Sequence, residues 1–70
     1  MESRIASLQQ KFKAARLGAA TMTLQEVEEL IQSLEDLAEY MNDRGDKSMA
    51  FIFNLEKEEV RAATFDFIVE

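Results

Sequence analysis

Cysteine and histidine are both absent from the 70 residues of this chain. Without cysteine no disulfide bond can form, and without either residue a structural zinc site lacks its usual ligands. The same absences remove the thiol nucleophile and the imidazole base that many enzymes use. Only two glycines are present, and they stand far apart, so there is no glycine-rich loop to bind a phosphate. We therefore expect no catalytic activity, no metal and no cofactor.

Long apolar runs are also missing. No stretch approaches the ~20 consecutive apolar residues that cross a membrane. Residues 1–17 contain no apolar run of the kind that marks a signal peptide. We expect a cytoplasmic protein that makes no contact with membranes.

Basic residues are scarce, and the net charge of −6 is unevenly distributed. Residues 1–22 carry four basic side chains and one acidic one, whereas residues 23–46 carry eight acidic side chains and one basic one. This asymmetry predicts a basic first helix beside an acidic second helix. The overall acidity argues against direct binding of nucleic acid, which needs a positive surface.

The clearest element is a helix at about residues 24–43. It opens with Thr23-Leu24-Gln25-Glu26, a capping box in which Thr23 and Glu26 satisfy each other's backbone amides. Gly45 follows it at a left-handed cap position. Apolar residues recur along this segment at three- and four-residue steps, as on one face of a helix. They are Leu24, Val27, Leu30, Ile31, Leu34, Leu37, Ala38 and Met41.

A second helix is expected at about residues 2–17, before Gly18. Its apolar face is narrow and consists of Ile5, Leu8, Phe12 and Ala15. The short connection at residues 19–22 makes the two helices antiparallel neighbours. We expect the basic residues of the first helix to pair with acidic residues of the second.

Residues 42–48 are polar and predict a turn. They include Arg44-Gly45-Asp46, the tripeptide that integrins recognise in extracellular proteins. Nothing indicates secretion, and Gly45 already has a structural reason to be there, so we favour the structural interpretation.

The last third of the chain is short, apolar and aromatic. Residues 49–55 and 60–69 resemble strands, which a charged turn at residues 56–59 would join into a hairpin. The alternative is a third helix capped by Asn54, since Glu-Lys-Glu-Glu favours helix and the turn has no Gly or Asn. We favour the hairpin. The predicted fold class is therefore α+β, a single small domain of residues 1–70 in which a helical hairpin precedes a β-hairpin; the alternative is an all-α three-helix domain.

So small a chain cannot hide all its apolar residues, which make up 47% of the sequence. We therefore expect a homodimer or larger assembly, with the aromatic segment in the interface. The candidate interface residues are Phe51, Phe53, Phe65 and Phe67.

Acidic residues are the remaining candidate site. They fall on the outer side of the second helix, where they form either a solvated face or a surface for a basic protein partner. These residues are Glu28, Glu29, Glu35, Asp36, Glu39 and Asp43. The function we expect is non-catalytic protein binding, as an adaptor or inhibitor that occupies a partner's surface. The alternatives are an inhibitor that imitates nucleic acid to block a DNA-binding protein such as a repressor, and a structural subunit of an assembly.

Overall fold

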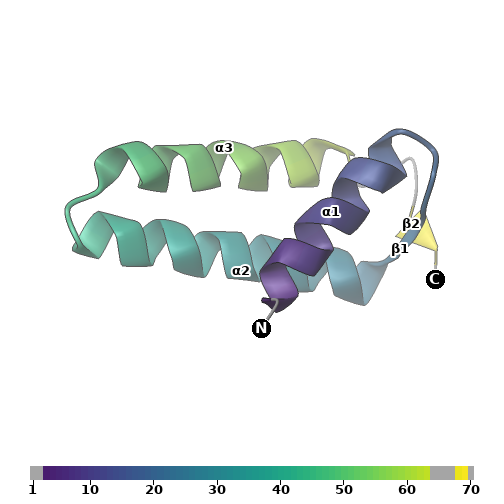
Figure 1. The fold of residues 1–70 in the computed structure, drawn as a ribbon, viewed down its shortest axis with the longest axis horizontal. Helices are drawn as coiled ribbons and strands as arrows, with labels where there is room; N and C mark the ends of the chain where they lie inside the picture. Colours follow the sequence, from purple (N-terminus) through teal and green to yellow (C-terminus); the bar gives the residue numbers. More distant parts are fainter. Residues whose placement is uncertain (1–2, 64–67, 70) are drawn as a thin grey trace.

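The computed structural model describes residues 3–63 and 68–69 of the chain. Within this part it contains three helices, α1 (Arg4–Arg16), α2 (Leu24–Asp43) and α3 (Lys47–Ala63). Two short strands, β1 (Met22–Thr23) and β2 (Ile68–Val69), pair in parallel. Helices α2 and α3 form an antiparallel hairpin, and α1 crosses it at the end away from their connecting turn (Figure 1).

Helix α1 begins two residues later than expected, at Arg4, and ends before Gly18 as expected. The hydroxyl of Ser3 accepts a hydrogen bond from the Ala6 amide at 3.2 Å and caps the first turn. At the other end Gly18 has a φ of 80°, and the Ala19 amide donates to the Ala14 carbonyl at 2.8 Å. This is the Schellman arrangement that commonly ends a helix.

Helix α2 has the bounds expected from the sequence, and its capping box is formed. The Glu26 amide donates to the Thr23 hydroxyl at 3.1 Å, and the Thr23 amide donates to the Glu26 carboxylate at 2.9 Å. The capped start fixes the point where the chain turns from β1 into the longest helix of the molecule.

In the turn between α2 and α3, Asp46 helps to end one helix and to begin the next. Gly45 has a φ of 86°, and the Asp46 amide donates to the Met41 carbonyl at 2.8 Å, which closes α2. The Asp46 carboxylate then accepts from the Met49 amide at 3.1 Å and caps α3. The Arg-Gly-Asp tripeptide is therefore accounted for by the turn itself.

The predicted α+β fold is wrong, and the all-α alternative describes the chain. Helix α3 runs through residues 49–55 and the turn at 56–59, where we expected a strand and a hairpin turn. It begins at Lys47, after the Asp46 cap, and not at Asn54. Ile68–Val69 is a strand, but it pairs in parallel with β1 and not with an antiparallel neighbour. Residues 64–67 of the expected second strand lie outside the described residues.

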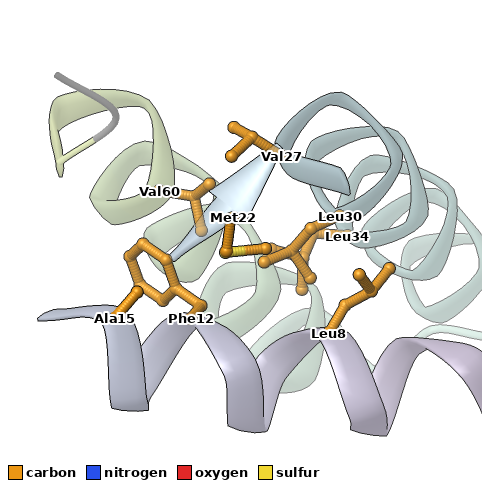
Figure 2. Packing of buried hydrophobic residues seen from close by; sticks show 8 residues of the cluster. All are labelled: Leu8, Phe12, Ala15, Met22, Val27, Leu30, Leu34 and Val60. Atoms are coloured by element: carbon orange, nitrogen blue, oxygen red, sulfur yellow. The ribbon is translucent and has the colours of Figure 1, made fainter. Parts of the chain in front are cut away.

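The core lies where the three helices and β1 meet. Leu8, Phe12 and Ala15 of α1 pack there against α2, as their spacing predicts, while Ile5 is only partly buried. Met22 of β1 fills the centre of this cluster between Val60 and Leu30 (Figure 2). The members of the core cluster are Leu8, Phe12, Ala15, Met22, Val27, Leu30, Leu34 and Val60.

Candidate functional site

The end of the α2–α3 hairpin near its turn has little core of its own. We call residues 35–43 and 47–55 the distal hairpin. The core cluster extends along α2 only to Leu34, and the buried hydrophobic residues of the distal hairpin are Ala38 and Ala50. Figure 1 shows α1 over the other half of the hairpin, so the distal hairpin consists of two helices side by side. Two helices cannot enclose large side chains on every side.

Large apolar side chains are exposed on the distal hairpin. Phe51 is 63% exposed, Ile52 46% and Leu55 49%, and all three belong to α3. Residues three and four apart share one side of a helix, so these three form a continuous surface that we call the apolar strip. On the other side of the same helix segment Ala50 is buried, and Phe53 packs against the core cluster.

The four predicted interface phenylalanines have different outcomes. Phe51 is exposed and belongs to the apolar strip, whereas Phe53 is partly buried and packs against the core cluster. Phe65 and Phe67 lie outside the described residues. Ile52 and Leu55 were missed as candidates. The signal that could have identified them is that residues 49–53 are all apolar and reach around the full circumference of a helix, so one side must remain uncovered by α2.

The acidic residues predicted as a partner-binding site lie along α2, which carries no basic residue. We call the six of them the acidic face. Glu29 is partly buried and binds Arg4 of α1 at 2.8 Å, and Asp36 accepts from Gln32 at 3.0 Å. The remaining four are exposed and form no ion pair with the residues that the structure describes; they are Glu28, Glu35, Glu39 and Asp43.

The expected pairing of α1 with α2 is present in two ion pairs. Lys11 binds Glu26 at 2.6 Å, and Arg4 binds Glu29. The Lys11 hydrogen bond, followed by that of the Thr23 amide, lowers the pKa of Glu26 below its ordinary value. The Arg4 hydrogen bond likewise lowers the pKa of Glu29. Arg16 departs from the expectation, because it binds Glu59 of α3 at 3.0 Å and lies over the Phe12 ring.

A cleft of about 590 Å³ lies between α1 and α3. Its apolar lining includes Phe12, Leu30 and Val60. Polar groups on its rim bind one another: the Gln9 amide donates to Glu56 at 2.8 Å, and Arg16 binds Glu59. These groups join α1 to α3, so the cleft is part of the way the helices pack.

Comparison of the chain with protein-family models, with curated proteins and with solved structures finds no match. Among the residues that the structure describes, no helix combines the length and the apolar character needed to cross a membrane.

Proposed function

We propose that this chain is a small, non-catalytic protein-binding protein that acts in the cytoplasm and uses the distal hairpin to contact another protein chain. The observation that carries the proposal is the apolar strip, three large side chains that are about half exposed or more on one helix. Isolated exposed apolar residues are ordinary, but adjacent ones on a rigid helix are typical of protein contact sites.

The residue types of the strip support a protein partner. Aromatic residues are enriched in the buried centres of protein interfaces, and charged residues are depleted there. Phe51, Ile52 and Leu55 all lie on a regular helix, so the strip needs little ordering when a partner binds. A surface that is already rigid loses less conformational entropy on binding than a flexible one.

A second candidate function rests on the acidic face of α2. Four exposed carboxylates along one helix, with no cation on that helix, offer a surface for a basic protein. An inhibitor that imitates nucleic acid would bind through such a surface, and its complex would weaken steeply as salt increases. A contact led by the apolar strip would depend much less on salt. The remaining alternative, a structural subunit, would also use the apolar strip.

The test is affinity capture from the native host, at low and high salt, with four forms of the full chain: the wild type, two variants and a control. The first form is the wild type, and the second carries Phe51→Gln and Leu55→Gln, which remove apolar surface while keeping good helix formers. The third carries Glu35→Gln, Glu39→Gln and Asp43→Asn, which neutralise part of the acidic face. Leu17→Gln is the matched control, because Leu17 is 85% exposed on the connection after α1, away from the strip.

We expect the strip variant to lose the captured protein at both salt concentrations, and the acidic-face and Leu17 variants to keep it. The second candidate function, binding through the acidic face, would be favoured by two results together. The acidic-face variant alone would lose the captured protein, and the wild-type complex would weaken as salt increases. A strip variant that behaves as wild type in capture and in self-association would refute the proposal.

A further inference from the structure

Residues 49–53 of α3 are all apolar and together reach around the helix, but α2 covers only one side of it. Ala50 is buried and Phe53 packs inward, whereas Phe51, Ile52 and Leu55 are left at the surface. A helix that is apolar around its circumference is normally buried on every side. We therefore expect another protein surface to cover the strip. The charged residues beside the strip indicate what that surface is.

Two opposite charges flank the strip at its ends. Lys47 lies one turn before Phe51, and Glu58 lies one turn after Leu55. Their separation of eleven residues is close to three helical turns, so both lie on the same side of α3. Both side chains are exposed, and neither forms an ion pair with a described residue.

Lys47 is also in a locally unfavourable position. It is the first residue of α3, where the helix dipole favours acidic side chains, and the first turn contains none. The helix itself thus gains nothing from a cation at this end. The Asp46 carboxylate already caps this end of α3, so an acidic group brought in from another chain would be stabilised there mainly by Lys47.

We propose that the apolar strip is covered by the strip of a second copy of this chain, with the two α3 helices antiparallel. A twofold axis that crosses α3 between Ile52 and Phe53 places Lys47 of each copy beside Glu58 of the partner subunit. Parallel packing would instead bring like charges together at both ends, which is unfavourable. The proposal rests on the assignment of the strip as a protein-contact surface, and it names the partner as this same chain.

The acidic faces permit this arrangement. Each chain carries a net charge of −6, so two copies repel each other unless their acidic surfaces stay apart. In the antiparallel pairing the two α3 helices lie at the centre. The α2 helices, which carry the acidic faces, lie on the outside. The paired particle would then present one acidic face on each side.

The first measurement is sedimentation equilibrium of the full chain from about 1 µM to about 1 mM, a range that covers weak to moderate self-association. We expect the mass to rise with concentration from 8.0 kDa toward twice that value. Phe51→Gln with Leu55→Gln should weaken association by at least about 30-fold, the effect typical of central interface residues. The Leu17→Gln control should associate as the wild type does. Circular dichroism melts establish that each variant is folded.

Charge exchange then tests the direction of packing. Lys47→Glu alone or Glu58→Lys alone should weaken association by about 3- to 10-fold, since each change affects two ion pairs in the dimer. The double exchange, Lys47→Glu with Glu58→Lys, should restore it, because both pairs re-form with reversed signs. A double variant no stronger than the single ones would overturn the antiparallel arrangement.

Engineered cysteines give an independent test, because the natural chain has none. Ile52→Cys lies next to the proposed axis and should form a disulfide-linked dimer under mild oxidation, whereas Leu17→Cys should not. A folded wild-type chain that stays monomeric throughout the range would refute self-association. If the strip variant then still lost a captured host protein, the proposed function would stand with a different partner. If it lost nothing, both proposals would fail.

Discussion

Leu34 and Glu35 are adjacent in sequence, but they have opposite environments in α2. Leu34 is 0% exposed inside the core cluster, whereas Glu35 is exposed on the acidic face. We expect Leu34→Ala to lower the free energy of unfolding by ~2–5 kcal/mol, enough to unfold much of so small a domain. Glu35→Ala should change it by no more than ~0.5 kcal/mol. The loss of stability caused by Ile31→Ala should lie between these two values, because Ile31 is only partly buried.

Thermal or urea melts of the three variants measure these differences directly. Equal and small effects at all three positions would mean that the apolar face of α2 is not the core of the molecule.

The ionisation of Glu26 should affect the stability of the fold. Its folded-state pKa lies below the ordinary value of 4.5, because Lys11 and the Thr23 amide stabilise the carboxylate. A lowered pKa means that the stabilisation is fully present above about pH 4.5 and is lost as the pH falls through the folded-state pKa. Glu26→Gln should therefore be less stable than wild type at neutral pH.

The stability difference between wild type and Glu26→Gln should shrink below pH 4.5 and vanish in strong acid. Urea melts at a series of pH values provide the measurement. Glu28→Gln is the matched control, since Glu28 is exposed and forms no ion pair with a described residue. A difference that stays constant with pH would show that Lys11 and the Thr23 amide do not stabilise the ionised form of Glu26.

At the scale of elements, local signals predicted α1 and α2 well because those signals are contained in the helices themselves. The capping box at Thr23, the glycine ends and the three- and four-residue spacing all act over a few residues. Helix α3 was mispredicted because residues 49–55 lack a polar side, and an apolar segment without periodicity fits a buried strand equally well. Its true start signal, Asp46, was assigned only to the turn that ends α2.

The candidate site was predicted in part, for a related reason. Sequence spacing placed the acidic face along α2, and composition indicated an excess of apolar surface that included Phe51. The sequence could not show which side of α3 would meet α2, because that depends on where α1 crosses the hairpin. Phe53 was therefore counted as surface, and Ile52 and Leu55 were overlooked.

The turn at Gly45 offers a prediction at this scale. Its φ of 86° lies in the left-handed region, and a side chain there would meet no neighbouring atom. Gly45→Ala should thus cost about 1 kcal/mol from backbone conformation alone. Gly45→Asn should cost less, since asparagine tolerates this region better. Chemical denaturation of both variants tests the order. An alanine variant as stable as wild type would mean that the turn can adopt another conformation.

The core occupies only one end of the molecule, which is elongated. Its radius of gyration is 12.3 Å, compared with about 11 Å for a compact domain of 70 residues. The core cluster occupies the end of the α2–α3 hairpin where α1 crosses, and the distal hairpin extends beyond it (Figure 1). Local stability follows buried apolar contacts, so it should be unequal along the two helices of the hairpin.

Amide hydrogen exchange should reveal this inequality and its dependence on concentration. In dilute solution, amides near Leu30, Leu34 and Val60 should exchange slowest, because they open only with the core. Amides of residues 38–52 should exchange faster through local opening, since the buried hydrophobic residues there are two small alanines, Ala38 and Ala50. Raising the protein concentration should then slow exchange in residues 48–55, where a second copy would cover the strip. Exchange rates in residues 24–34 should change little.

Protection that is uniform along α2 and α3 at low concentration would contradict the weak distal hairpin. Distal protection that stays fixed as concentration rises would contradict coverage of the strip by a second copy.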